Sequence, residues 1–320
     1  MTQHQSQSKS SKKQYDSNWT SRPERGTTFM LQVMSWISLH LGRTISRSIL
    51  HLITTYFLLF SRVSRRASRD YLRRVLRREP KLIDLYKHIF TFATTIHDRV
   101  YLINNRYDLF DITVHNEQII HDMLAQGRGA FLIGAHLGSF EVTHAMGRRH
   151  PDLQVIMVMF EENARKINSM LAAINPAIQQ EIIPLGHIDT MLKVRDRLND
   201  GSVLSILADR TLDDDMTLEV PFIDQLAPFP IGPFRMAALL DRPVIFMTGL
   251  YLGGNRYSIH FEQLADFSEI PAADKNAAIQ SAIKRYAALM EKYCRSAPYN
   301  WFNFFDFWQP ARHTKSLQTR

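Results

Sequence analysis

Residues 129–141 read GAFLIGAHLGSFE, and this stretch decides the fold class. The apolar run 130–135 has the length of a buried strand, and Gly138 marks a tight turn after it. A helix is expected to follow from Ser139. A continuously apolar strand followed by a turn and a helix is typical of a parallel sheet that helices cover on both faces.

The same alternation continues along the chain, which predicts an α/β fold. Further strands are expected at 153–160, 182–186, 203–209, 216–223, 243–253 and 257–264, and helices at 161–174 and 188–201. The last two strands are joined by Gly253, Gly254 and Asn255, which predicts an antiparallel pair. We therefore expect a central, mainly parallel sheet flanked by helices, preceded by a helical pattern over residues 80–125.

The composition of the chain indicates which kinds of binding partner are favoured. The formal net charge of +8 and the pI of about 9.6 favour anionic partners, such as nucleic acid, anionic lipid or an acidic protein. Cys294 is the single cysteine, so the chain can form no intrachain disulfide and no multi-cysteine metal site. Its place late in a predicted helix favours a structural thiol over a nucleophile.

The N-terminal part of the chain differs in composition from the predicted α/β domain. Residues 1–28 are rich in Ser, Gln, Lys and Arg, which predicts a disordered polar tail without the apolar core of a signal peptide. Residues 29–60 are strongly apolar, but Arg43 and Arg47 interrupt them beside Gly42. A spanning helix needs about 20 apolar residues. We therefore expect two short helices that lie at a membrane surface or pack on the domain.

Residues 61–78 carry eight arginines and one acid, with apolar residues at helical spacing. A basic helix directly after an apolar one favours contact with anionic lipid headgroups. Nucleic-acid binding and a solvated helix face without a partner are the alternatives, and the apolar neighbour favours the membrane. The predicted organisation is a tail at 1–28, membrane-associating helices at 29–78, an α/β domain at 79–310 and a polar tail at 311–320.

Three predicted strands end in polar residues, which predicts one shared crevice. His136 follows the strand 130–135, Glu161 and Glu162 follow the next strand, and Asp209 and Arg210 follow 203–208. In open α/β sheets, sites collect beyond the carboxyl ends of the strands.

His136 and Glu141 are candidates for a catalytic pair. If the strand ends at His136 and the helix begins at Ser139, Glu141 lies in the first helical turn and can fold back towards the imidazole. A carboxylate on one ring nitrogen fixes the tautomer and leaves the other nitrogen as a general base for a hydroxyl or amine. The alternative is a histidine that caps the turn, with Glu141 favoured near a positive helix N-terminus.

The segment GAHLGSFE resembles the H-x4-D/E motif of glycerolipid acyltransferases. More of the chain is similar to one branch, the bacterial lipid A biosynthesis (late) acyltransferase family. Residues 204–245, LSILADRTLDDDMTLEVPFIDQLAPFPIGPFRMAALLDRPVI, resemble that family's buried strand ending in Asp, its V-P-F segment and the helix after it. The resemblance covers roughly residues 29–310. Arg210, where the family usually has Gln, and residues 229–232, FPIG, where it has T-x-x-G, depart from the family's pattern. The aromatic segment 298–310 also departs from it and looks closer to a divergent branch, including acyltransferases associated with aryl polyene lipids.

The resemblance implies transfer of a fatty acyl group from an acyl carrier protein thioester to a lipid or glycolipid acceptor at the membrane. It implies no cofactor, no metal and no nucleic acid, and a peripheral or monotopic location on the cytoplasmic face of the bacterial inner membrane. The residues that match the family's motifs are His136 as base and Glu141 as its partner, with Arg165, Asn168, Asp209 and Arg210 towards substrate.

Four points stay open from the residues alone. The oxyanion donors are expected to be the backbone N–H groups of Gly138 and Ser139, and Ser139 as a covalent nucleophile is the runner-up mechanism. A non-catalytic lipid-binding protein of the same fold is the rival function. A metal hydrolase using His136, Glu141 and Asp209 lacks a second histidine at ligand spacing. The aromatic segment suits either core packing or a bilayer surface.

Overall fold

The computed structural model describes residues 25–147, 153–177, 180–187, 189–211 and 216–308. The predicted tail at 311–320 and residues 1–24 of the other tail lie outside this part of the chain. Residues 25–28, which the composition assigns to the disordered tail, form the first turn of helix α1 (Arg25–Phe60) instead.

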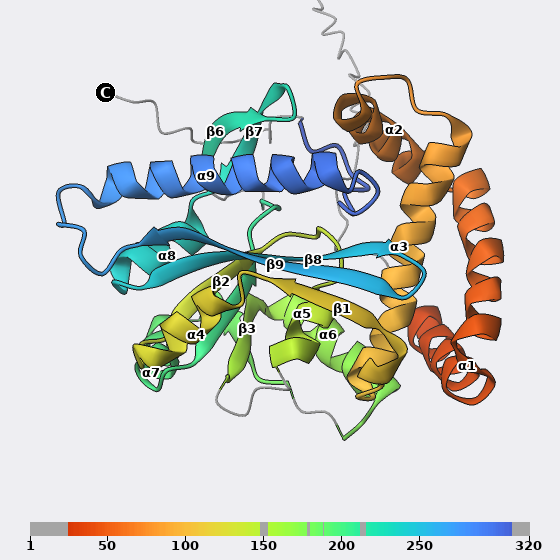
Figure 1. Ribbon diagram of the computed structural model, residues 1–320, viewed down its shortest axis with the longest axis horizontal. Coiled ribbons are helices and arrows are strands. Elements are labelled where there is room, and N and C mark those ends of the chain that lie inside the picture. Colours follow the sequence, from red (N-terminus) through yellow and green to blue (C-terminus); the bar gives the residue numbers. More distant parts are fainter. Residues whose placement is uncertain (1–24, 148–152, 178–179, 188, 212–215, 309–320) are drawn as a thin grey trace, which may run out of the picture.

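A seven-stranded sheet forms the centre of the molecule, and the α/β prediction is confirmed (Figure 1). Its strands stand in the order β1-β9-β8-β2-β5-β3-β4. Every neighbouring pair is parallel except β8 and β9, the predicted antiparallel pair. The bounds are β1 Asp111–His115, β2 Ala130–Gly134, β3 Val155–Phe160, β4 Ile182–Leu185, β5 Val203–Leu207, β8 Pro243–Gly253 and β9 Arg256–Asp266.

Helices cover both faces of this sheet, as its continuously buried strands require. Alternate side chains of β2 illustrate the two layers: Phe131 and Ile133 join a core with α9, whereas Leu132 joins a core with α4 and α5. Figure 1 shows α9 running along one face and α1, α2 and α3 gathered at one end of the sheet. The bounds are α2 Arg62–Leu76, α3 Leu82–Ile103, α4 Gln118–Ala125, α5 Phe140–Gly147, α6 Glu161–Ile174, α7 Thr190–Asn199, α8 Gly232–Leu239 and α9 Lys275–Ser296, with a 3-10 turn at Tyr107–Leu109.

Two features of the sheet differ from the sequence prediction. The helical pattern over 80–125 is wrong at β1, where the alternating sequence DITVH pairs with β9 as an edge strand that is half exposed. Strand β6 (Thr217–Phe222) lies where a strand was predicted, but it pairs only with β7 (Gln225–Pro230) in a separate two-stranded sheet.

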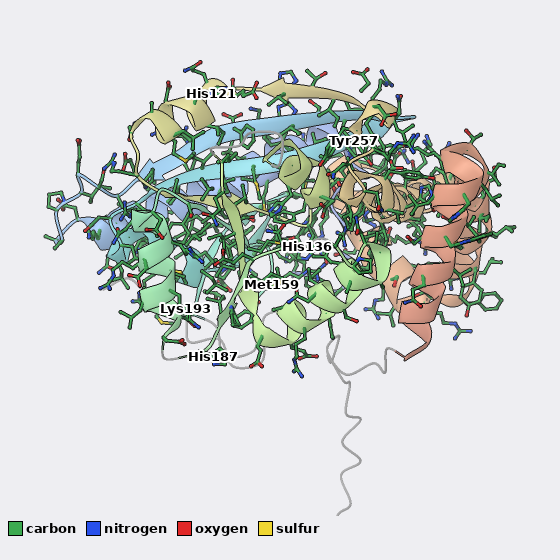
Figure 2. All side chains as sticks on the ribbon, turned by 90° about the horizontal axis from the view of Figure 1, so that it is seen from below. His121, His136, Met159, His187, Lys193 and Tyr257 are labelled. Atoms are coloured by element: carbon green, nitrogen blue, oxygen red, sulfur yellow. The ribbon has the colours of Figure 1, made fainter. Side chains whose placement is uncertain are left out.

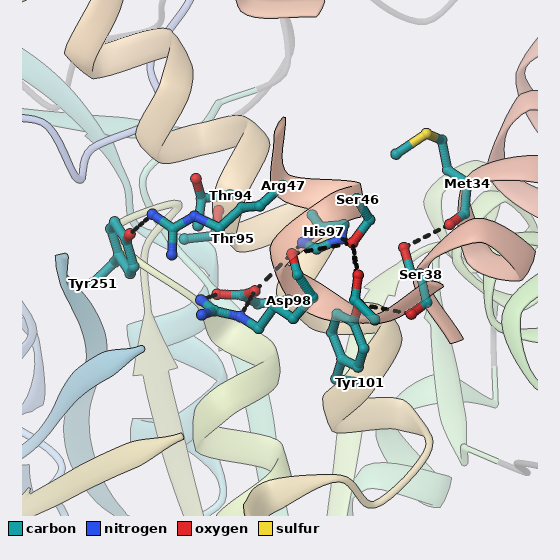
Figure 3. A network of polar contacts seen from close by, with 12 residues as sticks. Met34, Ser38, Ser46, Arg47, Thr94, Thr95, His97, Asp98, Tyr101 and Tyr251 are labelled. Carbon is teal, nitrogen blue, oxygen red and sulfur yellow. Dashed lines mark hydrogen bonds and ion pairs between the residues drawn. The ribbon is translucent and has the colours of Figure 1, made fainter. Parts of the chain in front are cut away.

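The apolar helix α1 breaks at Gly42, which has a φ of 81°, and it packs against α3. The arginine beside the break is docked on the domain: Arg43 donates two hydrogen bonds of 2.8 Å to the carboxylate of Asp98. Arg47 donates to the Tyr251 hydroxyl at 2.6 Å, and Figure 3 shows this contact next to Asp98. In the same network the hydroxyl of Tyr101 donates to the carbonyl of Ser38 at 2.9 Å. None of the helices in the described residues has an apolar stretch long enough to cross a bilayer.

The aromatic segment near the C-terminus packs into the core. Trp301 is fully buried, and its ring makes edge contacts with Tyr71 of α2 and Phe222 of β6. Phe307 and Trp308 are also buried in this cluster. Cys294 lies buried in α9, where burial raises the pKa of its thiol, as expected of a structural cysteine.

Removing the Asp98 carboxylate should destabilise the fold, because it leaves Arg43 and the hydroxyl of Tyr257 without their buried partner. Breaking a buried ion pair on one side costs about 3–5 kcal/mol. We expect Asp98→Ala to lower the free energy of unfolding in urea by about that amount. The control Asp108→Ala removes an exposed pair with Arg106 and should cost less than about 1 kcal/mol. Equal losses in the two variants would contradict this account of α1 docking.

Candidate active site

His136 lies two residues beyond the carboxyl end of β2, in the loop that leads to α5. The loop turns at Gly138, which has a φ of 75°. A Cβ atom at Gly138 would lie 2.2 Å from the carbonyl oxygen of Gly249, and one at Gly249 would lie 2.6 Å from the Ser139 carbonyl. The two backbones therefore approach as closely as two glycines allow, and this contact fixes the position of the loop.

The carboxylate that contacts the His136 ring belongs to Asp209. His136 Nδ1 lies 2.8 Å from Asp209 Oδ1, and the backbone N–H of His136 donates to Asp209 Oδ2 at 3.1 Å. Because a carboxylate only accepts, Nδ1 carries the proton and Nε2 keeps the lone pair. The sequence spacing predicted Glu141 at this ring nitrogen. Asp209 reaches it instead because β5 and β2 are adjacent parallel strands, so their ends meet.

Trp301 completes the surroundings of Asp209. Its indole Nε1 donates to Asp209 Oδ2 at 3.0 Å. Asp209 is 2% exposed, and each of its oxygens accepts a hydrogen bond from another segment of the chain. Burial alone would raise the pKa of Asp209, but the charges and N–H groups of His136, Arg210 and Trp301 hold it well below the usual range. Asp209 is therefore ionised at neutral pH.

The imidazole of His136 is neutral at the same pH. Burial lowers its pKa below that of an ordinary histidine; Asp209 opposes this effect, and the nearby positive charges of Arg210 and Arg99 add to it. About a third of the side chain is exposed, at 32%. Its Nε2 makes no hydrogen bond with the described residues. A neutral, accessible imidazole held by a buried carboxylate can act as a general base.

The backbone N–H groups of Gly138 and Ser139, which were predicted to be oxyanion donors, are already bonded to carbonyl groups of the chain. This prediction is therefore wrong. The N–H of Gly138 donates to the carbonyl of Asn300 at 2.8 Å, and the N–H of Ser139 donates to the carbonyl of Gly249 at 2.7 Å. The close approach of Gly138 and Gly249 brings these acceptors within reach. Ser139 Oγ accepts a hydrogen bond of 3.3 Å from the N–H of Val142, so this buried serine caps α5.

A cavity of about 630 Å³ opens beside His136. Its lining is mostly apolar and comes from α3, β3, β5, α6, α8 and the loop after β2; it includes Phe92, Ile96, Met159, Ile167, Leu207 and Met236. Figure 2 shows His136 and Met159 close together in the middle of the view, whereas His121 and His187 lie towards the periphery. The volume is in the range of pockets that hold small-molecule ligands, roughly 300–1,000 Å³.

The structure brings some of the predicted residues to this cavity and leaves others outside it. Arg210, Gly138 and Ser139 line it together with His136. Arg165 and Asn168 are exposed on α6, while Asn163, Lys166 and Ile167 of the same helix line the cavity. Positions 163, 166 and 167 share one face of the helix, whereas positions 165 and 168 lie on a different face.

Glu141 is buried in the first turn of α5. Its charge acts on Arg99 of α3, a cavity residue that sequence reasoning missed. Arg99 sits in a predicted helical segment without a motif, so no local signal marks it. Trp301 was predicted to lie in the core or at a bilayer surface, because nothing in the sequence connects it to Asp209. No group of three or more metal-ligating side chains occurs among the described residues.

Comparison with known families matches residues 16–309 to the family model described as "Bacterial lipid A biosynthesis acyltransferase". No match to the chain was found among curated proteins. The family model covers the sheet, the cavity and every residue of the His136 site.

The Asp209 contact makes a direct prediction for the titration of His136. Asp209 raises the pKa of His136 against the lowering effect of burial, so Asp209→Asn should lower the pKa of His136 further. The measurement is a pH titration of the His136 ring signals by NMR, assigned with His136→Gln. Glu141→Gln is the matched control, because Glu141 is not in contact with the ring nitrogen that Asp209 holds. A larger shift in Glu141→Gln than in Asp209→Asn would reverse this assignment.

Proposed function

The chain belongs to the bacterial lipid A biosynthesis acyltransferase family, and we propose that it transfers a fatty acyl group from an acyl carrier protein thioester to a hydroxyl or amine of a lipid or glycolipid acceptor at a membrane surface. The observation that carries the proposal is the pairing of neutral His136 with buried, ionised Asp209 beside a largely apolar cavity. The cavity would hold the acyl chain, and His136 would be the base that acyl transfer requires.

The chemistry proceeds in two steps and needs no covalent enzyme intermediate. Nε2 of His136 takes the proton from the acceptor hydroxyl, and the oxygen attacks the thioester carbonyl carbon. When the tetrahedral intermediate collapses, the carbon–sulfur bond breaks and the imidazolium returns its proton to the leaving thiolate. Asp209 stabilises the imidazolium between these steps. Ser139 does not fit a nucleophile's role, because its hydroxyl is buried and caps α5.

Glu141 has a supporting place in this proposal. Its position in α5 puts its negative charge within range of Arg99, whose pKa it raises against the lowering effect of burial. It therefore acts on the charge balance of the cavity, and Asp209 acts on the base. The donor proposal is supported by the net charge of +8, because acidic carrier proteins are attracted to basic surfaces.

The surface where α1 meets α2 supports docking on an anionic membrane. The large apolar side chains exposed there include Tyr56, Phe57, Phe60 and Val63. Among the α2 arginines, Arg62, Arg66 and Arg69 are exposed and make no hydrogen bond or ion pair with the described residues, and their spacing places them on one helix face. We refer to these seven residues as the docking patch. An apolar segment beside unpaired arginines is the composition of helices that lie on anionic bilayers.

Replacing the base should remove most of the activity. We expect His136→Ala to lower the rate of acyl transfer from an acyl carrier protein thioester by about two to four orders of magnitude. Because the neutral imidazole is the active form, the wild-type rate should fall with decreasing pH at a pH below the ordinary pKa of histidine. Asp209→Asn should cost more activity than Glu141→Gln. Wild-type turnover in His136→Ala, with its melting temperature unchanged, would exclude the mechanism.

The docking patch predicts a charge-dependent membrane affinity. The triple variant Arg62→Glu, Arg66→Glu and Arg69→Glu should bind vesicles with 30% anionic lipid at least about tenfold more weakly, since each basic residue near such a surface contributes about 1 kcal/mol. The control Lys193→Glu, Arg195→Glu and Arg197→Glu changes the net charge equally on α7 and should bind like the wild type. Flotation of the protein with vesicles is the measurement. If both triple variants lose binding equally, net charge and not the docking patch is responsible.

A further inference from the structure

Three arginines line the cavity, and in two of them, Arg99 and Arg210, the Nε atom is buried without a hydrogen bond and the guanidinium has no ion pair with the described residues. Arg99 comes from α3 and Arg210 from the loop after β5, and both line the cavity. No carboxylate is part of the lining formed by the described residues. Neither guanidinium is within 4.0 Å of a carboxylate oxygen in the described part of the chain, although Glu141 and Asp209 act on them from further away.

The few contacts that these side chains make are weak. Arg99 Nη1 lies 3.2 Å from the sulfur of Met170, a poor acceptor, and its Nε is buried without a hydrogen bond. Arg210 Nη2 reaches the carbonyl of Phe302 at 3.4 Å, and its Nε is likewise buried and unbonded. A buried charged group without hydrogen-bond partners costs free energy, which a bound anion would offset. The N–H groups of both arginines that lack a hydrogen bond therefore point to a ligand.

The position of the two charges shows which part of a substrate they can reach. Both line the same cavity as His136, which places them on the side where the reacting hydroxyl would bind. The phosphate of a carrier protein's prosthetic arm stands at the far end of that arm from the thioester. An anion beside His136 is therefore more readily supplied by the acceptor. Guanidinium groups recognise phosphate and carboxylate with paired N–H donors, and two of them together favour the higher charge of a phosphate ester.

We propose that Arg99 and Arg210 bind a phosphate ester of the acceptor, next to the hydroxyl that His136 deprotonates. This inference rests on the proposed function for the identity of the acceptor, but the binding of the anion is independent of it. The enzyme would then use acceptors in which a phosphate lies close to the reacting hydroxyl. Arg99, which has no sequence motif, would contribute to this specificity.

The first test measures binding without catalysis. Monododecyl phosphate, titrated calorimetrically below its critical micelle concentration, should bind the wild-type protein at least tenfold more tightly than uncharged dodecyl glucoside, a difference of about 1.4 kcal/mol. Arg99→Met and Arg210→Met should each lose this preference, and Arg99→Lys should keep part of it. Arg195→Met, on the exposed face of α7, is the control and should behave as the wild type. No preference in the wild type, or a full preference in Arg99→Met, would overturn the proposal.

The second test identifies the source of the anion. Transfer to lysophosphatidic acid is compared with transfer to monoacylglycerol, each with an acyl-phosphopantetheine and an acyl-pantetheine donor. The loss of kcat/KM in Arg99→Met should disappear when the acceptor lacks phosphate and persist when the donor lacks it. The reverse pattern would assign the site to the donor and overturn the proposal. Absence of transfer to any acceptor in the wild type would count against the proposed function, while the binding test still decides whether the anion site exists.

Discussion

The carboxylate of Asp209 is the contact on which the rest of the site depends. One oxygen holds His136 Nδ1, and the other accepts hydrogen bonds from the His136 backbone and the Trp301 indole. Three segments that are distant in the sequence therefore meet at one buried charge. The low pKa of Asp209 reflects how well these donors compensate its burial. A shift of any of the three segments would leave the carboxylate partly unsatisfied, so the site and the fold stabilise each other.

The same contacts connect the site to the helices at the end of the sheet. Burial lowers the pKa of His88 on α3 to about 4, so its ring is neutral. Its Nε2 donates to the carbonyl of Trp301 at 2.7 Å, and its Nδ1 accepts from the hydroxyl of Ser68 on α2 at 2.8 Å. Hydrogen bonds of His88 and of two different groups of Trp301 thus connect α2, which carries part of the docking patch, to Asp209. Tyr71 is fully buried and packs against both His88 and Trp301.

The sequence predicted what depends on local pattern, and it missed what depends on strand order. The strands predicted from residue 130 onwards, the turn at Gly138 and the antiparallel hairpin follow from periodicity and glycine placement, and they are confirmed, whereas β1 and β7 were not predicted. The partner of His136 does not follow, because Glu141 is near in sequence whereas Asp209 is near only once β5 lies beside β2. Arg165 was expected in the site from its motif, but the rotation of α6 about its axis turns it outwards. Helix rotation and strand order arise from packing across the whole core, which no short segment encodes.

The late position of Trp301 in the chain has a consequence for how the protein is made. A ribosome adds about 5–20 residues per second, and segments begin to fold as they emerge. Helices α1 and α2 leave the ribosome before the segment with Asn300, Trp301 and Phe302, which holds the His136 loop. The nascent chain therefore has its docking patch seconds before it has a competent base. During synthesis the proposed membrane contact is therefore complete before the proposed catalytic base is held in place.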